Sequence, residues 1–260
     1  MIELEKIRIS QSLMKDLSVY KNKNSCGIQL VSKYIDGVQF PSSDVMELGN
    51  YFEFICTGSV ARDGHIPMAE MTKSGKLTAK YENAHAQKKN FDKVMNHYGF
   101  ILTETDHHFD NGEANGIADI IATRNGERVI IDTKFSGLLE NKWEDRGWAD
   151  ESIETKDTLL IQAVHYKLLA YDEWGVWNMP FFFMVFSNTN PTDYKVFEII
   201  CDEDTLEKHK LNIVGAKKYF INEFENGFKP RPNYKECSKC PLADGCEYFT
   251  DVPDITIVYY

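Results

Sequence analysis

The sequence lacks long apolar runs. No stretch approaches the roughly 18 uninterrupted apolar residues that a membrane-spanning helix requires, so we expect no membrane partner. The first ten residues, MIELEKIRIS, have no apolar segment of the signal-peptide kind, and we therefore expect a cytoplasmic protein. Internal repeats and low-complexity tracts are also missing. The sequence thus predicts one globular domain over residues 1–260.

Positive charge is scarce. The chain has 29 Lys and Arg residues against 40 Asp and Glu residues, a formal net charge of −11. This balance argues against broad non-specific adhesion to nucleic acid, so a DNA-binding protein of this composition needs a local basic surface. Residues 73–93 offer one, with six lysines and two acids: Lys73, Lys76, Lys80, Lys88, Lys89 and Lys93 against Glu82 and Asp92. The alternative is an ordinary solvated helix face.

Hydrophobic residues make up 43% of the 260 residues, enough for a full core. Periodicity and capping residues predict five helical stretches. We expect them over residues 9–34 (opening on a Ser10 cap and broken near 22–27), 47–59, 79–98, 158–174 and 202–225. Residues 62–75 are polar, contain glycine and are expected to form a loop.

The apolar pattern changes after residue 99. Residues 100–109, 116–123 and 127–135 are short runs rich in Ile, Val, Phe and Thr, and the pairs Asn111-Gly112 and Asn125-Gly126 separate them. Such pairs are strong hairpin signals, so we expect an antiparallel meander of three strands. Two more strands are expected over residues 180–187 and 194–201. The order of elements predicts an α/β fold.

Two acids and a lysine stand in apolar surroundings. Asp119 interrupts GIADIIA, while Asp132 and Lys134 end ERVIIDTKF and, being two residues apart on a strand, leave the same face. If the two strands pair through the intervening hairpin, Asp119 and Asp132 approach one another. Paired carboxylates suit a hard divalent cation such as Mg²⁺. The alternative is a buried Asp–Lys ion pair without chemistry.

These residues carry a resemblance. The segment from Gly116 to Asp119, the segment from Asp132 to Lys134, and Gln162-Ala-Val-His-Tyr166 are similar in order and placement to the motifs of the RecB-like branch of PD-(D/E)XK nucleases. The resemblance implies a restriction-endonuclease-like core, a central mixed sheet flanked by helices. It covers about residues 10–246, nearly the whole chain.

The resemblance also implies roles for individual residues. Asp119 and Asp132 would ligate Mg²⁺ or Mn²⁺ with the Thr133 carbonyl as a third ligand, and Lys134 would act on the attacking water. Gln162 and Tyr166, one helical turn apart, would face the site.

One position departs from the pattern. Many relatives have a histidine four residues after a glycine on an upstream helix, whereas Glu53 stands there in this chain. We expect Glu53 to be a third acidic ligand. His65, His85 and His108 are the residues that could replace it.

The six cysteines fall into two groups. Cys56 and Cys201 lie in apolar segments and are expected to pack in the core. Cys237, Cys240 and Cys246 follow a C-x2-C-x5-C spacing, which fits part of a zinc site or of an iron–sulfur site. Cys26 is the remaining candidate for a fourth ligand.

The resemblance favours iron–sulfur. One upstream cysteine with three near the C-terminus is the arrangement of RecB-like nucleases that hold a 4Fe-4S cluster, among them CRISPR-associated and phage exonucleases. It implies a cap made of residues 10–40 and 228–250. Zinc at the same cysteines, or free thiols, are the alternatives.

The function predicted is hydrolysis of DNA phosphodiester bonds by a metal-dependent nuclease, in particular an exonuclease. Its partners would be DNA and other recombination, replication or defence proteins. The alternative is a catalytically idle DNA-binding or scaffold subunit that keeps the fold. The presence of Asp119, Asp132 and Lys134 argues against this alternative.

Overall fold

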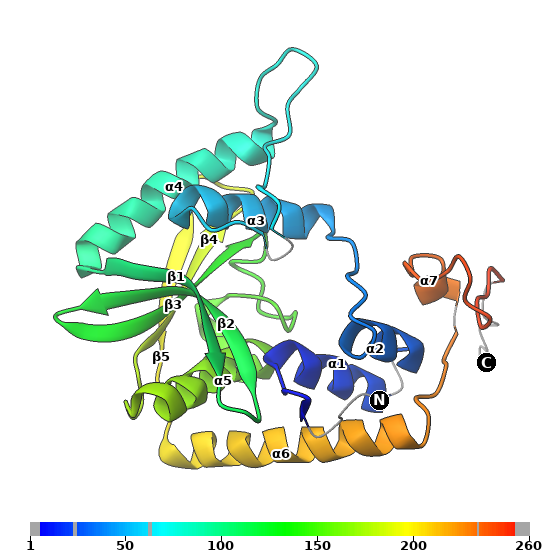
Figure 1. The fold of residues 1–260 in the computed structure, drawn as a ribbon. Helices are drawn as coiled ribbons and strands as arrows, with labels where there is room; N and C mark the ends of the chain where they lie inside the picture. The colour runs from blue at the N-terminus through cyan, green and yellow to red at the C-terminus, as the bar shows by residue number, and fades with distance from the viewer. Residues whose placement is uncertain (1–5, 23–24, 62–63, 233, 253–260) are drawn as a thin grey trace, which may run out of the picture. The chain divides into compact units, whose positions relative to one another are not determined.

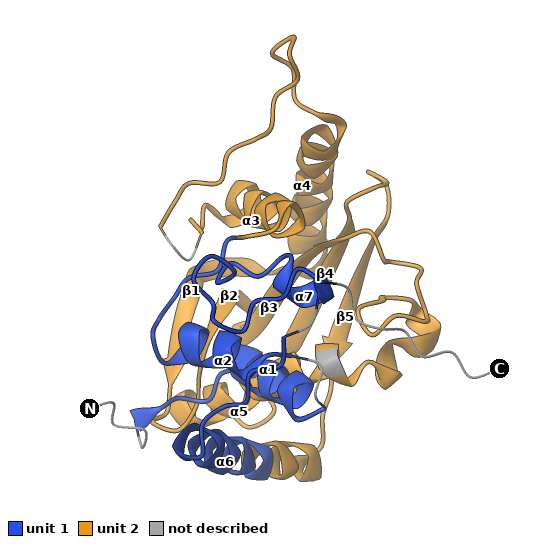
Figure 2. Ribbon diagram, turned by 90° about the vertical axis from the view of Figure 1, so that its right-hand side faces the viewer, with its two compact units in different colours: residues 1–41, 211–260 blue, residues 42–210 orange. Residues whose placement is uncertain are grey.

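The computed structural model describes residues 6–22, 25–61, 64–232 and 234–252. The chain divides into two compact units, shown in Figure 2. The first contains both ends of the chain, Met1–Pro41 and Leu211–Tyr260, and the second is the continuous segment Ser42–Lys210. A cluster-bound cap formed by residues 10–40 and 228–250 stays a prediction. None of the described helices is long and apolar enough to cross a membrane.

The second unit is built on one mixed sheet of five strands in the order β1-β2-β3-β4-β5 (Figure 1). The strands are β1 (Ile101–Asp110), β2 (Asn115–Arg124), β3 (Glu127–Ser136), β4 (Phe181–Ser187) and β5 (Tyr194–Ile199). β1, β2 and β3 form an antiparallel meander, β4 runs parallel to β3, and β5 returns antiparallel to β4. The predicted α/β class and the three-stranded meander are confirmed.

The β2–β3 hairpin turns where the sequence predicted it. Asn125 and Gly126 both have positive φ values, 53° and 85°. Asparagine and glycine tolerate this left-handed backbone better than other residues, which is why they match the twist of a two-residue hairpin. The turn fixes the register Arg124↔Glu127 and every pair that follows it.

Helices flank this sheet. The second unit contains α3 (Asp44–Thr57), α4 (Ala79–Tyr98), the 3₁₀ helix η2 (Asp150–Thr155) and α5 (Asp157–Trp174), and α6 (Glu203–Glu225) begins in it. α3 starts three residues before the predicted start at residue 47, because the Ser43 side chain accepts a hydrogen bond from the Met46 amide at 3.3 Å. The sequence did not predict η2, which lies in the acidic connection before α5.

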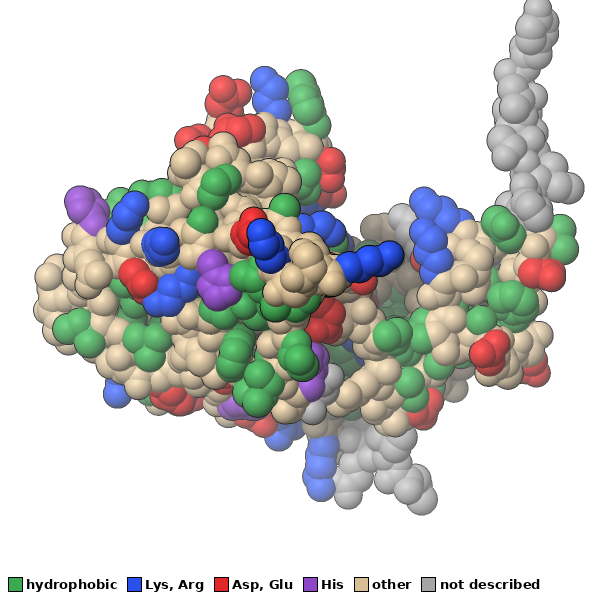
Figure 3. All heavy atoms as spheres, turned by 90° about the horizontal axis from the view of Figure 1, so that it is seen from above, with side chains coloured by type: hydrophobic (Ala, Val, Ile, Leu, Met, Phe, Trp, Pro, Cys, Tyr) green, Lys and Arg blue, Asp and Glu red, His purple; other side chains and the backbone are tan. Residues whose placement is uncertain are grey.

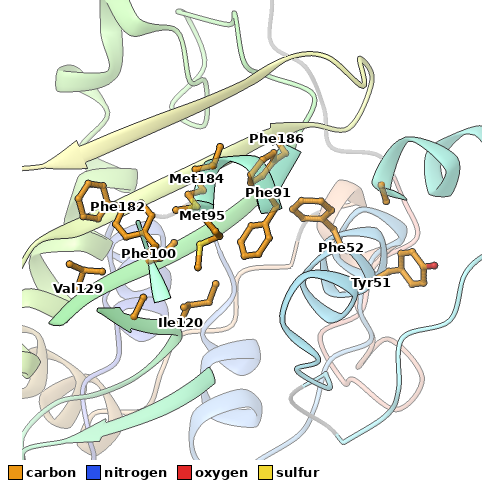
Figure 4. Close-up of a cluster of buried hydrophobic side chains, with 14 of the residues drawn as sticks. Tyr51, Phe52, Phe91, Met95, Phe100, Ile120, Val129, Phe182, Met184 and Phe186 are labelled. Carbon is orange, nitrogen blue, oxygen red and sulfur yellow. The ribbon is translucent and has the colours of Figure 1, made fainter. Parts of the chain in front are cut away.

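One apolar layer lies between the sheet and the helices α3 and α4. The β2, β3 and β4 side chains of one sheet face meet aromatic and aliphatic side chains of both helices, and Figure 4 shows part of this cluster. Its labelled members are Tyr51, Phe52, Phe91, Met95, Phe100, Ile120, Val129, Phe182, Met184 and Phe186. Cys56 packs against the same cluster, as expected of a core cysteine.

The opposite face of the sheet packs against α5. The Tyr166 ring stacks on Phe181 with centroids 6.2 Å apart and an interplanar angle of 9°. β4 is buried along its whole length because both faces of the sheet are covered at this strand. This is why its sequence, FFFMVFS, shows no polar alternation.

Two lysines of the predicted basic region make contacts within the region itself. Lys88 forms an ion pair with Asp92 at 2.7 Å, one helical turn away on α4, and Lys93 donates to Asn90 at 3.3 Å. The face of the molecule seen in Figure 3 has Lys and Arg side chains lying among Asp and Glu side chains. Residues 73–93 therefore keep the balance of six lysines against two acids, with Lys88 paired inside the region.

The first unit contains α1 (Gln11–Lys21), α2 (Gly27–Tyr34), the end of α6 and the short α7 (Tyr234–Cys237). The helical stretch expected over residues 9–34 is broken as predicted, and Ser10 caps α1 by accepting from the Leu13 amide at 3.1 Å. Tyr20 is fully buried, donates to Glu223 at 3.1 Å and accepts from the Lys229 amide at 3.0 Å. Segments about 200 residues apart in sequence thus share one small core.

Truncation of a central aromatic side chain tests the role of the first apolar layer. Phe186 is fully buried and its ring lies 5.2 Å from Phe52 and 6.2 Å from Phe91. Phe186→Ala should lower the free energy of unfolding by about 3–5 kcal/mol, measured by urea denaturation. Val45→Ala, at a position 67% exposed, should change it by less than about 0.5 kcal/mol. A loss below about 1 kcal/mol for Phe186→Ala would contradict this packing.

Candidate active site

The candidate site lies where β2 and β3 separate. Their register runs from Arg124↔Glu127 to Ile120↔Ile131, one residue short of Asp119 and Asp132. Beyond this point β2 pairs only with β1, as far as Asn115, and β3 pairs only with β4, as far as Ser136. The two strands therefore form a fork, and both acids stand at its base.

Asp119 takes over a backbone function in the fork. Its Oδ2 atom accepts a hydrogen bond from the Thr133 amide at 3.1 Å. In a continuous ladder the amides of β3 on this edge would donate to carbonyls of β2. The carboxylate replaces such a carbonyl, so its position is fixed by the backbone of β3.

Asp132 is the most enclosed acid of the site, 1% exposed. Its carboxylate accepts a hydrogen bond from Gln162 Nε2 at 2.5 Å and forms an ion pair with Lys134. Gln162 lies on α5 and Lys134 lies on β3, so side chains from a helix and a strand fix the position of this carboxylate. Asp132, Lys134 and Gln162, grouped by the sequence motifs, are brought into contact by the structure.

Tyr166 supports the β2 side of the fork. Its hydroxyl donates to the Ile117 carbonyl at 2.5 Å. A Cβ atom on Gly116 would lie 2.7 Å from Tyr166 Cε1, so only glycine lets the ring approach the strand this closely. The close packing of the Tyr166 ring thus explains why the sequence motif has a glycine at position 116, ahead of Asp119.

Lys134 is held as a cation. Burial by itself would lower the pKa of its ammonium, but the negative charges of Asp132 and Asp119 outweigh burial and raise the pKa above its ordinary value. The side chain is 31% exposed, so the charge reaches the surface of the site. In this arrangement Lys134 can attract and neutralise an anion.

Glu53 on α3 belongs to the same electrostatic cluster. Burial, followed by the negative charges of Asp119 and Asp132, raises the pKa of its carboxyl to about 8. Of the three histidines considered in its place, His65 contacts Glu47 at 3.2 Å and His85 contacts Tyr51 at 2.9 Å. The third, His108, is an exposed residue of β1 that pairs with Ile117. Three carboxyl groups thus interact with a single lysine.

Asp106 is a residue of this site that sequence reasoning missed. It lies on β1 between the pairs Thr105↔Ile120 and His107↔Ala118, opposite Asp119, and its φ is 53°. Its charge also contributes to the raised pKa of Glu53. β1 is polar along most of its length, so no apolar background marked this acid as unusual in the sequence.

The donor set fits a hard divalent cation. Glu53, Asp119 and Asp132 offer only carboxylate oxygens, the ligands that Mg²⁺ and Mn²⁺ prefer. When ionised they carry three negative charges against the one positive charge of Lys134. Across the described ranges, no three His, Cys, Asp or Glu side chains already stand at metal-binding spacing. Asp132 is engaged by Lys134 and Gln162, so binding a cation would require this carboxylate to be shared.

The four cysteines singled out by their spacing line one pocket of the first unit, together with Gln29 and Arg231. The Cys26 sulfur accepts from the Arg231 amide at 3.3 Å, and the Cys240 sulfur accepts from Gln29 Nε2 at 3.3 Å. Hydrogen-bonded turns join Cys237 to Cys240 and Ala243 to Cys246. Donors directed at sulfur are typical of sites that hold thiolates.

Cys56 and Cys201 have different surroundings. Burial is the main cause that raises the pKa of both thiols. Raised pKa values describe thiols that stay protonated, which suits packing rather than metal binding.

Comparison of the sequence with known proteins gives no match. No protein-family model matches the chain, and no curated protein sequence matches it significantly.

Comparison of the structure gives several matches. A protein of Eubacterium rectale, provisionally named an exonuclease, superposes with a TM-score of 0.66 at 17% sequence identity. The alignment covers 98% of this chain and 92% of that protein. At this identity the similarity establishes a shared fold over nearly the whole chain.

Weaker similarity extends to LHK-Exo, an alkaline exonuclease from Laribacter hongkongensis. Its complex with dAMP aligns with a TM-score of 0.49 at 15% identity, and a second structure of LHK-Exo aligns with 0.47 at 14%. Both alignments cover 85% of this chain and 92% of the other.

The charge cluster predicts a pH dependence of stability. Because the folded-state pKa of Glu53 is raised from 4.5 to about 8, the stability contributed by its protonated form is present below about pH 4.5 and is lost as the pH rises towards 8. Glu53→Gln cannot ionise, so its melting temperature relative to wild type should increase across this window. The measurement is a series of thermal melts in chelator-containing buffers.

The exposed substitution Glu82→Gln on α4 is the matched control and should show no such gain. A constant difference between Glu53→Gln and wild type from pH 4.5 to 8 would show that Glu53 lies outside the cluster.

Proposed function

We propose that this protein is a metal-dependent DNA nuclease of the PD-(D/E)XK type. The observation that carries the proposal is the group formed by Asp119, Asp132 and Lys134 at the base of the strand fork, supported by Gln162 and Tyr166. The fold shared with the Eubacterium rectale protein, named an exonuclease, supports the same reading. Exonuclease action is the more specific form of the proposal.

Glu53, Asp119 and Asp132 would hold Mg²⁺ or Mn²⁺, with the Thr133 carbonyl as a further ligand. A bound divalent ion supplies Lewis acidity, lowers the pKa of water and compensates charge on a phosphate. Asp119 is the acid whose position is set by the backbone of β3, and Asp132 is the acid whose position is set by α5.

Lys134 has a complementary role. As a cation beside the carboxylates, it can bind the scissile phosphate and compensate the negative charge that develops during hydrolysis. Gln162 keeps Asp132 oriented, and Tyr166 keeps β2 in place beside it. A raised pKa makes Lys134 a poor proton acceptor while Asp132 and Asp119 face it without a competing cation. Sharing those carboxylates with a divalent ion would lower this pKa towards a value suited to an attacking water.

We further propose that the pocket lined by Cys26, Cys237, Cys240 and Cys246 holds a 4Fe-4S cluster. Four sulfurs satisfy the ligand count of such a cluster, and two of them accept hydrogen bonds from the surrounding chain. Zinc is the alternative occupant, since four thiolates also form a structural zinc site. Either occupant would tie the N-terminal part of the first unit to its C-terminal part.

Removal of the Asp132 or the Lys134 side chain tests the proposed nuclease activity. Asp132→Ala or Lys134→Ala should reduce cleavage of end-labelled linear DNA in Mg²⁺ at least 100-fold, because each removes a group that contacts the reacting phosphate or its cation. Cleavage by the wild-type protein should stop on adding a chelator. Circular DNA assayed in parallel distinguishes exonuclease from endonuclease action.

Asp172→Asn is the matched control, an acid of α5 whose side chain contacts Asn111 rather than the site. Near wild-type cleavage by Lys134→Ala or Asp132→Ala would remove the assignment. Absence of cleavage by the wild-type protein, with DNA binding intact, would favour the idle scaffold subunit instead.

Substitution of single cysteines tests the cluster. Protein purified without oxygen should be brown and contain about four irons per chain. Serine at Cys26, Cys237, Cys240 or Cys246 should bleach the colour and lower the melting temperature, because loss of the cluster frees both parts of the first unit. Cys56→Ser and Cys201→Ser are the matched controls and should keep the colour. Stoichiometric zinc without iron would assign the pocket to zinc.

A further inference from the structure

Two buried histidines lie next to the β2 arm of the fork, and none of the roles proposed above involves them. His165 on α5 and His209 on α6 are 0% and 3% exposed, and both belong to the second unit. His165 Nδ1 lies 3.0 Å from His209 Nε2, and His165 Nε2 lies 3.0 Å from the Asn115 carbonyl oxygen. Burial lowers the pKa of both rings, so both are neutral.

The chain of contacts fixes the position of each proton. A carbonyl oxygen can only accept, so His165 Nε2 must carry the hydrogen that bonds to Asn115. In the neutral ring His165 Nδ1 is then the acceptor, and His209 Nε2 must donate to it. His209 therefore selects the tautomer of His165 that can bond to β2, in the way that an outer partner sets the tautomer of a histidine ligand.

The bonded carbonyl lies on the fork. Asn115 is the first residue of β2, in the part of the strand that pairs with β1 but no longer with β3. Two residues on, Ile117 is held by Tyr166, and two residues further Asp119 bonds to the Thr133 amide. Neighbouring side chains of α5 thus bond alternate residues of the separated strand and replace the missing ladder.

We propose that His165 and His209 are positioning residues that hold β2 apart from β3 and thereby place the Asp119 carboxylate for binding a divalent cation. This inference rests on the proposed nuclease function for its metal, but the placement of Asp119 is a property of the protein alone. Loss of the His209 donor would free His165 to take the other tautomer, which cannot donate to Asn115. The β2 arm of the fork would then shift, and Asp119 would move relative to Thr133.

The experiment compares three substitutions and keeps a fourth in reserve. His209→Phe keeps a ring but removes the donor, and His209→Gln supplies an amide donor in its place. Lys167→Met is the matched control: Lys167 is a buried polar residue of α5, the helix that carries His165, is 1% exposed, and bonds to Asn178 instead of the fork. His209→Ala provides a smaller substitution if His209→Phe does not fold.

Two readouts are used, neither of which is catalysis. The first is hydrogen exchange of the Thr133 amide in metal-free protein, which reports its bond to Asp119. The second is the affinity for Mn²⁺, followed by electron paramagnetic resonance. His209→Phe should accelerate exchange at Thr133 about tenfold and weaken Mn²⁺ binding about tenfold, the lower end of the effect of outer-partner substitutions. His209→Gln should restore most of both values, and Lys167→Met should lower the melting temperature with both unchanged.

The outcomes separate the two proposals. The positioning role would be overturned if the Thr133 amide of His209→Phe exchanged at the wild-type rate. It would also be overturned if Lys167→Met accelerated this exchange as much as His209→Phe does. Either result counts whatever the metal affinity. If the wild-type protein binds no Mn²⁺ while Thr133 exchange still responds to His209→Phe, the metal site fails and the control of the fork by His209 stands.

Discussion

The parting of β2 from β3 is the constraint on which the candidate site depends. A β-sheet is stable when its backbone donors and acceptors are paired, so two strands that separate inside a folded unit leave groups that need other partners. The described chain supplies them with side chains: Asp119 for the Thr133 amide, and Tyr166 and His165 for the Ile117 and Asn115 carbonyls. The polar residues of the fork are there first because the backbone requires them. One of them, Asp119, is charged, and it lies close enough to Asp132 and Lys134 to share one electrostatic cluster with them.

The fork also explains why these charges are unusual. Glu53, Asp119 and Asp132 are near one another because α3, β2 and β3 meet at the point where the sheet opens, and burial there denies them water. The consequence is a raised pKa at Glu53 and a lysine held firmly in its charged form. Groups perturbed in this way by both burial and neighbours are typical of functional sites. Ordinary surface ion pairs of this chain, such as Lys33 with Asp16, lack such enclosure.

Local signals in the sequence were sufficient for the five strands, for the three-stranded meander and for part of the site. The pairs of asparagine and glycine located the hairpins, and the alternation in ERVIIDTKF placed Asp132 and Lys134 on one face of β3. Asp106 and the histidine pair could not be found in this way. Asp106 is identified by its place on β1 beside Asp119 and by its charge effect on Glu53, which the sequence does not show. His165 and His209 are separated by 44 residues and are brought together by packing. The cysteines were an intermediate case, because their spacing is local for three of them and long-range for Cys26.

The division of the chain has a consequence for the order in which the protein is made. Residues of the second unit are continuous, so this unit can fold as soon as Lys210 has left the ribosome. The first unit cannot, because Tyr20 needs Glu223 and Lys229, and Gly27 donates to the Lys229 carbonyl at 3.0 Å. α1 and α2 are synthesised early, but the bonds of Tyr20 and Gly27 cannot form until residues 223–229 have been made. The bonds that close the first unit therefore form only after the second unit has been synthesised.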